Sequence, residues 1–187
     1  MHNILIAPNS FKGSLSAMEV ADTIMAGLKE SRLDFNAALF PIGDGGDHTA
    51  HLMTAYLQGE MVGHWVEGAY GNLVEARYGL VKARNMAILE IAETSGFKTI
   101  TGQEIKPLEA TTRGLGQLIL HVIEMGIGHI VICLGGTATI DGGIGMLAAL
   151  GLRFLDGQDA PVEASPVDFD RVKRIDASGL HQLLGHC

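Results

Sequence analysis

Cysteine is scarce in this chain, and so are long apolar stretches. The two cysteines stand apart, Cys133 inside an apolar run and Cys187 at the last position, which indicates neither a disulfide framework nor a thiolate metal site. The longest apolar runs reach about five residues, far below the roughly 20 that a membrane-spanning helix needs. Residues 1–3 lack the basic region of a secretory signal. We therefore expect a soluble, cytoplasmic protein with no membrane partner.

Positive charge is also scarce. The 187 residues carry a formal net charge of −8, and the densest basic stretch is Arg171-Val172-Lys173-Arg174. A protein that binds nucleic acid needs a basic surface along the phosphate backbone, so this composition disfavours a nucleic-acid partner. A small phosphorylated ligand remains compatible, because it needs only a local pocket of N–H donors, one or two cations and usually a divalent metal.

The common phosphate-binding and acyl-transfer motifs are missing. The chain contains neither Gly-x-x-x-x-Gly-Lys-Ser/Thr nor, after its first predicted strand, Gly-x-Gly-x-x-Gly. It also has no Gly-x-Ser-x-Gly turn for a serine nucleophile. A P-loop enzyme, a typical dinucleotide-binding protein and a serine-dependent acyl-transfer enzyme are therefore unsupported.

Apolar residues, by contrast, make up 47% of the sequence, enough to bury the core of one large domain or two small ones. Apolar periods of two and of about 3.6 residues alternate along the chain. They predict strands over 3–7, 35–42, 60–67, 73–81, 85–91, 130–134 and 152–155, and helices over 16–30, 52–57, 118–125 and 144–150. The expected fold class is α/β, a mixed or mostly parallel sheet with flanking helices, and the last segment, residues 175–187, shows no evident closing strand.

Polar loops follow the first two predicted strands. The first loop carries Ser10, Lys12 and Ser14. The second carries Asp44, which has a glycine before it and is followed by Gly45 and Gly46. Ligands of open α/β sheets bind beyond the carboxyl ends of the strands, where these groups are expected to lie. Lys12 is therefore a candidate ligand-binding cation and Asp44 a candidate for handling a metal or a hydroxyl group. The alternatives are an ordinary surface lysine and a turn aspartate.

A third loop, residues 134–143, follows the apolar run that ends at Leu134. Its backbone N–H groups, its threonine hydroxyls and the helix that follows offer the donors an anion needs. The candidate phosphate-binding residues are Gly135, Gly136, Thr137 and Thr139. Asp141, the carboxylate of this loop, is a second candidate for a metal ligand or general base. The three loops together predict a phosphate-handling enzyme.

A different reading starts from the acidic and histidine residues near the second loop. Asp44, Asp47, His48 and His51 have side chains that suit a hydrolytic zinc or manganese site, so a metal-dependent hydrolase using Asp44, His48 and His51 is the main alternative. The His-Glu-x-x-His pattern is absent, and Asp47 is better explained as the N-cap of the next helix. Glu90 interrupts an apolar strand, and the sequence leaves open whether it faces water or is paired in a cleft.

Taken together, these motifs resemble a known family. The segments Ala7–Leu15, Pro41–Asp47 and Gly135–Gly143 are similar, in order and approximate spacing, to three signatures of the bacterial glycerate kinases, and Thr111–Gly114 to a fourth. The resemblance implies ATP-dependent phosphorylation of glycerate to phosphoglycerate with Mg²⁺. It also implies a flavodoxin-like domain, of which residues 1–65 form part, and a restriction-endonuclease-like α/β domain over residues 66–187.

The chemistry of that reaction suggests roles for the loop residues. Lys12 is expected to bind phosphate or the glycerate carboxylate, and Asp44 to bind Mg²⁺ or orient the attacking hydroxyl. The loop from Gly135 to Thr139 is expected to cradle an oxyanion, with Asp141 as a second metal ligand or base. Which aspartate is the base, and which hydroxyl of glycerate reacts, stays open.

The chain also departs from the family pattern. Asn9 stands where the family usually has aspartate, His48 where it has glycine, and Leu115 and Gln117 alter the fourth signature. Family members are about twice as long, so the chain resembles an N-terminal half, and the missing half is expected to complete the nucleotide site. Three forms remain open: a half that acts with a separate chain supplying the rest, a homo-oligomer, and a non-catalytic remnant.

Overall fold

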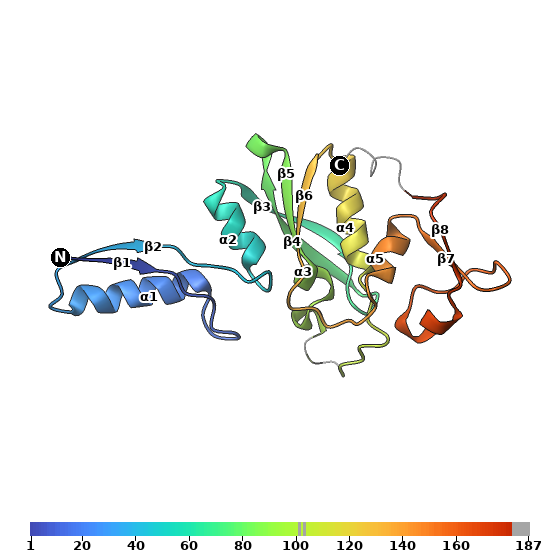
Figure 1. The fold of residues 1–187 in the computed structure, drawn as a ribbon, viewed down its shortest axis with the longest axis horizontal. Coiled ribbons are helices and arrows are strands. Elements are labelled where there is room, and N and C mark those ends of the chain that lie inside the picture. The colour runs from blue at the N-terminus through green and yellow to red at the C-terminus, as the bar shows by residue number, and fades with distance from the viewer. Residues whose placement is uncertain (101, 103, 181–187) are drawn as a thin grey trace.

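The computed structural model describes residues 1–100, 102 and 104–180 (Figure 1). Its elements follow in the order β1 (His2–Ile6), α1 (Ala17–Glu30), β2 (Phe35–Leu39), α2 (Thr49–Tyr56), β3 (Glu60–Glu67), β4 (Leu73–Val81), β5 (Met86–Glu90), α3 (Ile91–Ser95), α4 (Arg113–Glu124), β6 (His129–Cys133), α5 (Ile144–Ala149), β7 (Arg153–Leu155) and β8 (Arg174–Asp176). Short 3-10 helices cover Lys82–Arg84, Phe97–Ile100 and Pro166–Arg171. The α/β class and the mixed sheet are confirmed.

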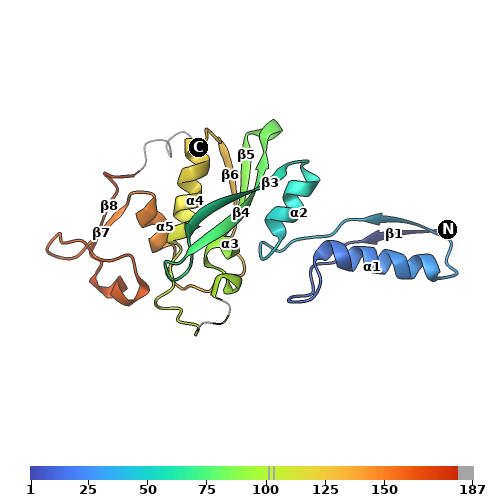
Figure 2. The same ribbon diagram turned by 180° about the vertical axis from the view of Figure 1, so that it is seen from behind.

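The first three elements form a small layer that lies to one side of the remaining chain (Figures 1 and 2). Strands β1 and β2 pair in parallel, and α1 packs along them. Helix α1 begins with the capping box typical of Ser-x-x-Glu, since the Glu19 N–H donates to Ser16 Oγ at 3.3 Å and the Ser16 N–H donates to Glu19 Oε2 at 2.7 Å. The loops that follow β1 and β2 extend from this layer toward the central sheet.

The central sheet has the strand order β3-β4-β5-β6, with the first two pairings antiparallel and the pairing of β5 with β6 parallel. Along β4, the strand expected over 73–81, Ala76 and Tyr78 are buried while Glu75 and Arg77 are exposed, so one face packs on the core and the other faces water. The core between this sheet and α4 includes Tyr78, Leu89 and Leu118, and α2 packs on β4 and β5.

Beyond α5, the chain contains a strand that the sequence analysis did not expect. Strand β8 pairs antiparallel with β7, and the Arg153 guanidinium contacts the Asp176 carboxylate across the pair. The expectation of no closing strand in the last segment was therefore wrong at residues 175 and 176, and residues 181–187 of that segment lie outside the described residues. A strand of three residues is too short to show a period, and its pairing depends on a distant segment.

The predicted domain boundary between residues 65 and 66 falls inside a strand. Strand β3 runs through residues 65 and 66 as one element of the central sheet, and the layer of β1, α1 and β2 lies apart from that sheet. The division into residues 1–65 and 66–187 stays a prediction. Within the described part of the chain, no helix combines the length and apolar character needed to cross a membrane.

Candidate active site

The three polar loops predicted from the sequence meet around one cavity of about 470 Å³. The first loop leaves β1, the second leaves β2 and the third leaves β6, so each lies at the carboxyl end of its strand. The structure brings together most of the predicted binding groups along the cavity wall, namely Ser10, Lys12, Ser14, Asp44, Gly46, Gly135 and Gly136. The wall also includes Phe11, Glu19, Asp47 and His48.

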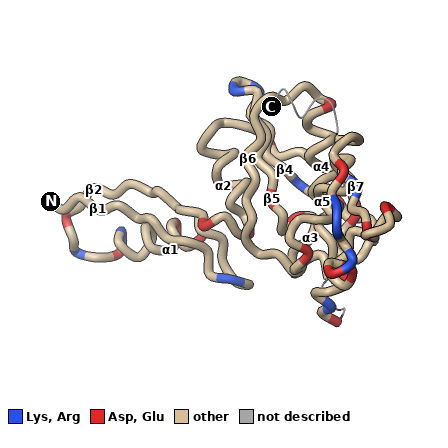
Figure 3. The backbone as a smooth tube through the Cα atoms, turned by 45° about the vertical axis from the view of Figure 1, so that its right-hand side comes forward, with Lys and Arg blue, Asp and Glu red and all other residues tan. Residues whose placement is uncertain are grey.

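Lys12 lies at the tip of a tight turn. The Phe11 N–H donates to the Leu15 carbonyl at 2.9 Å and the Leu15 N–H donates to the Phe11 carbonyl at 3.1 Å, which closes the turn. Gly13 has a φ of +75°, a conformation that glycine adopts without strain. The basic segment of this loop projects at its tip (Figure 3), and the Lys12 side chain is exposed. The turn therefore places the exposed Lys12 at the cavity wall.

Asp44 is held by two hydrogen bonds from neighbouring groups. The Gly46 N–H donates to Asp44 Oδ1 at 2.9 Å, and the Asn9 side-chain amide donates to Asp44 Oδ2 at 3.1 Å. The Gly46 N–H and then the Asn9 amide lower the pKa of Asp44 below its ordinary value, since both stabilise the ionised carboxylate. Asn9, where the family pattern has aspartate, thus links the first loop to the second.

The second and third loops touch through their backbones. The Gly135 N–H donates to the Gly45 carbonyl at 2.6 Å. A β-carbon at Gly135 would lie 2.6 Å from the Gly46 Cα, closer than such atoms approach, so only glycine fits there. The contact explains the glycine at position 135, and it brings the third loop to the cavity.

The two threonines of the third loop are engaged within the protein. Thr139 Oγ1 donates to the Ala110 carbonyl at 2.8 Å and accepts the Asp141 N–H at 3.0 Å. Thr137 Oγ1 accepts the Thr139 N–H at 3.3 Å. Neither threonine is on the cavity wall. Of the predicted oxyanion cradle, only the glycine part lies in the cavity.

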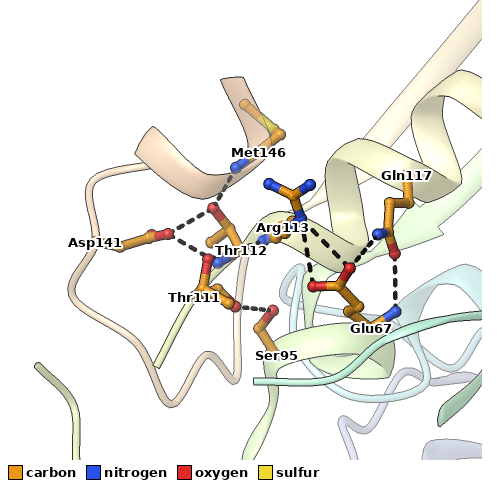
Figure 4. Close-up of polar contacts among 8 residues, drawn as sticks. All are labelled: Glu67, Ser95, Thr111, Thr112, Arg113, Gln117, Asp141 and Met146. Carbon is orange, nitrogen blue, oxygen red and sulfur yellow. Dashed lines mark hydrogen bonds and ion pairs between the residues drawn. The ribbon is translucent and has the colours of Figure 1, made fainter. Parts of the chain in front are cut away.

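Asp141 lies away from Lys12 and Asp44 and is 1% exposed. Its Oδ2 accepts the Thr112 N–H at 2.7 Å, the Thr112 hydroxyl at 2.8 Å and the Gly145 N–H at 3.2 Å. Its Oδ1 accepts the Gly143 N–H at 3.0 Å. Figure 4 shows the carboxylate pointing toward Thr112, between the starts of α4 and α5. The predicted roles of Asp141 in metal binding or base catalysis stay predictions.

The fourth signature forms a separate polar network. Arg113 Nε lies 3.3 Å from Glu67 Oε2, and Gln117 Nε2 donates to Glu67 Oε1 at 2.8 Å (Figure 4). Gln117 Oε1 also accepts the Glu67 N–H at 2.8 Å. Gln117, one of the departures from the family pattern, thereby ties α4 to the end of β3. A second cavity of about 220 Å³ lies beside Arg113.

The start of α2 differs from the expectation. The N-cap is His48, whose side chain makes no capping hydrogen bond, so the prediction of Asp47 as N-cap was wrong. Glu90 takes over this function from the end of β5, because its carboxylate accepts the His48 N–H at 3.2 Å and the Ala50 N–H at 2.5 Å. Sequence analysis missed the contact because Glu90 is 42 residues from His48 in the sequence.

Glu90 is not on a water-facing side of β5, since it is 3% exposed. Burial, together with the nearby charge of Glu93, raises its pKa above the ordinary value, against the opposing hydrogen bond from Ala50. Of the two interpretations that the sequence left open, the paired carboxylate is therefore the correct one.

The histidine-based metal site receives no support from the arrangement of donors. Among residues 1–100, 102 and 104–180, no three side chains of His, Cys, Asp or Glu are grouped so that they could hold a metal ion. His48 lines the large cavity and also a separate cavity of about 230 Å³, which it shares with His51, Arg77 and Glu93. A hydrolytic zinc site needs three protein ligands, which this set does not supply.

Comparisons with known proteins agree with the resemblance seen in the motifs. The family model described as the glycerate kinase family matches residues 4–187. The chain is 37% identical over 183 residues to a glycerate kinase of Bacillus cereus and 39% identical over 184 residues to a glycerate 2-kinase of Escherichia coli K12; each match covers 98% of this chain and 48% of the relative. A crystal structure described as a glycerate kinase 2 from Salmonella typhimurium LT2 superposes with a TM-score of 0.80 at 38% identity, covering 100% of this chain and 51% of that one. The chain thus spans about half the length of the relatives it matches.

Proposed function

Because this chain belongs to the glycerate kinase family, we propose that it carries the N-terminal half of a site that transfers the γ-phosphoryl group of ATP to a hydroxyl of glycerate, giving phosphoglycerate and ADP. The observation that carries the proposal is the meeting of the Lys12, Asp44 and Gly135 loops at one cavity. Phosphoryl transfer depends on positioning and on stabilisation of charge, and these loops supply groups for both.

Lys12 and the glycines have the first role in this proposal. The exposed ammonium group of Lys12 acts as a point charge for a phosphate or for the glycerate carboxylate. Ser10 and Ser14 flank it with hydroxyl groups, and Gly135 and Gly136 line the same cavity. A cavity of about 470 Å³ is large enough for glycerate together with part of a nucleotide.

Asp44 has the second role, as a Mg²⁺ ligand or as the group that orients the attacking hydroxyl. The cavity wall carries the carboxylates of Glu19, Asp44 and Asp47 against the single ammonium of Lys12, so a bare phosphate would be repelled there. Each oxygen of Asp44 accepts one hydrogen bond and has capacity for another partner, so its donor set fits Mg²⁺. Mg²⁺ is usually held by one or two carboxylates with the substrate phosphates, and it would neutralise phosphate charge.

Asp141 and the threonines support the loop from within. The contacts of Asp141 with Thr112, Gly143 and Gly145 fix the starts of α4 and α5, and this in turn fixes the shape in which the third loop presents Gly135 and Gly136. We place Asp141 in a positioning role on this ground, in preference to base catalysis or metal binding.

The rest of the site, in this proposal, comes either from a separate polypeptide equivalent to the other half of the relatives or from a second copy of this chain in a homo-oligomer, in the cytoplasm. The test is glycerate-dependent ADP release in the presence of Mg²⁺, measured for the chain alone and for the chain mixed with such a polypeptide. We expect activity in the mixture, and a loss of at least about a hundredfold in Lys12→Ala and Asp44→Asn.

Other outcomes of the same experiment favour the alternatives. Hydrolysis of phosphoesters that disappears in His48→Ala and His51→Ala would support the metal-dependent hydrolase. A folded chain that binds neither glycerate nor ATP and gains no activity from the second polypeptide would support the non-catalytic remnant.

A further inference from the structure

His48 has a backbone conformation that is uncommon for a residue with a β-carbon. Its φ is +68° and its ψ is 4°, in the left-handed region. Among residues 1–100, 102 and 104–180, the other residues with positive φ apart from glycines are Gln58, Asn85 and Asp159, and His48 alone of these lines the large cavity. Glycine adopts this conformation freely, which fits the glycine that the family pattern has at this position.

The His48 side chain does not cap the helix that follows it. Good N-cap residues accept a helix N–H with a side-chain oxygen, and His48 makes no such bond. The backbone is instead fixed from outside, because the buried carboxylate of Glu90 accepts the N–H groups of both His48 and Ala50. An unfavourable conformation that is held by its surroundings, at a residue that lines a cavity, points to a side-chain function.

The surroundings of the ring include both signs of charge. The His48 side chain is exposed and lines the cavity, as do Lys12, Glu19, Asp44 and Asp47. The pKa of Glu19 is lowered chiefly by its hydrogen bonds with Ser16 and also by the charge of His48, so ring and carboxylate lie within electrostatic range. On the other side, Glu90 from β5 contacts the His48 backbone, and His51 follows one turn along α2.

We propose that His48 is a ligand-contacting residue of the large cavity, whose imidazole N–H donates to an anionic oxygen of the ligand that Lys12 also binds. The proposal rests on the function proposed above, and it concerns a residue that the family pattern lacks. The anionic oxygen belongs either to the carboxylate of glycerate or to a phosphate of Mg²⁺-bound ATP. The imidazole would be a second hydrogen-bond donor for the anion, beside Lys12, in a wall that also carries three carboxylates.

The test measures binding by titration calorimetry with the full 187-residue chain, once with glycerate and once with ATP and Mg²⁺. The variants are His48→Ala, His48→Gly and Lys12→Ala, and the matched control is His129→Ala, which removes an exposed histidine outside the cavity. We expect both His48 variants to bind one of the two ligands about tenfold more weakly, because a hydrogen bond to a charged group is lost. The ligand that is affected identifies the oxygen.

The melting temperatures of the variants show whether weaker binding comes from the loss of the ring or from unfolding. His48→Gly relieves the backbone conformation and is expected to melt above His48→Ala, yet it lacks the ring and so should bind as weakly. Wild-type affinity in His48→Gly, with weakened binding in Lys12→Ala, would overturn the role of His48 and leave the proposed function intact. A wild-type chain that binds neither ligand, alone or mixed with the second polypeptide, would overturn both.

Discussion

Gly135 lies so close to Gly46 that a β-carbon on Gly135 would stand 2.6 Å from the Gly46 Cα. The Gly135 N–H also donates to the Gly45 carbonyl at 2.6 Å, so the two loops share a backbone contact that admits no side chain. This contact joins the loop after β2 to the loop after β6, and hence the N-terminal layer to the central sheet.

Gly135→Ala should therefore separate the two loops. We expect a loss in the free energy of unfolding of about 1–3 kcal/mol from overpacking, and weaker binding of any ligand of the large cavity. Chemical denaturation measures the first effect and calorimetry the second. The control is Gly27→Ala in α1, where nothing lies within 4 Å of a new β-carbon; it should be neutral or stabilising. Equal behaviour of the two variants would contradict the contact.

Asp141→Asn should destabilise the chain strongly. The carboxylate accepts four hydrogen bonds. In asparagine an NH₂ group replaces one of the two oxygens, and this group cannot accept the hydrogen bonds that the oxygen accepted. We expect the free energy of unfolding to fall by about 3 kcal/mol. Asp22→Asn, at an exposed position of α1, should change it by less than about 0.5 kcal/mol. A similar small effect at Asp141 would mean that its hydrogen bonds contribute little.

Glu90 should make stability depend on pH. Burial raises its pKa above the ordinary value of 4.5, so between that value and the raised pKa the folded chain binds more protons than the unfolded chain. The contribution of Glu90 to stability is therefore fully present below pH 4.5 and is lost as the pH rises through the raised pKa. Relative to Glu90→Gln, the wild-type chain should lose stability over that range.

Urea denaturation of both proteins at a series of pH values measures this difference. The comparison isolates Glu90 because every other carboxylate is common to the two chains. A difference between wild type and Glu90→Gln that stays constant from pH 4 to pH 8 would show that the carboxylate is solvated despite its position.

How far the sequence predicts this fold depends on the range of the contacts involved. The capping box of Ser16 and Glu19 and the alternation along β4 are local patterns, and the helix expected over 16–30 and the strand expected over 73–81 are both present. Strand β8 was missed because its partner β7 lies far back in the chain. The capping of α2 by Glu90 was missed for the same reason, since only the folded sheet brings that carboxylate to His48.

In the candidate site, too, local features were predictable and features that depend on long-range contacts were not. The loop that carries Lys12, the loop that carries Asp44 and the glycines at 135 and 136 were predictable as a group, because each loop follows a strand. The sequence did not predict that Thr139 and Asp141 turn away from the cavity, since that depends on hydrogen bonds with Ala110 and Thr112.

Cys133 should react slowly with thiol reagents. Burial, and then the charge of Glu90, raises its pKa from 9.0 to about 11, and the side chain is 6% exposed. The thiolate fraction at pH 8 is then about a hundredfold lower than for an ordinary thiol, which slows alkylation at least as much. The measurement uses Cys187→Ser, so that one thiol remains. Fast labelling in the native state, equal to that in denaturant, would contradict the burial.

Asn9→Asp should raise the pKa of Asp44. The Asn9 amide now donates to Asp44 Oδ2 at 3.1 Å, and it ranks after the Gly46 N–H among the causes that lower the pKa of that carboxyl. Aspartate at position 9 would place a second negative charge at this distance, which disfavours ionisation of both carboxyls. Asn9→Ala removes only the donor, so the rise should be smaller.

Carboxyl-detected NMR titration measures the pKa in wild type and in both variants. Asp156 serves as the internal reference, because the N–H groups of Gln158 and Ala160 lower its pKa independently of position 9. If the Asp44 titration is the same in all three chains while Asp156 behaves as expected, the amide does not stabilise the carboxylate. A rise in Asn9→Asp that Mg²⁺ reverses would further indicate that the carboxylates at positions 9 and 44 bind the ion together, since a divalent cation favours the ionised form.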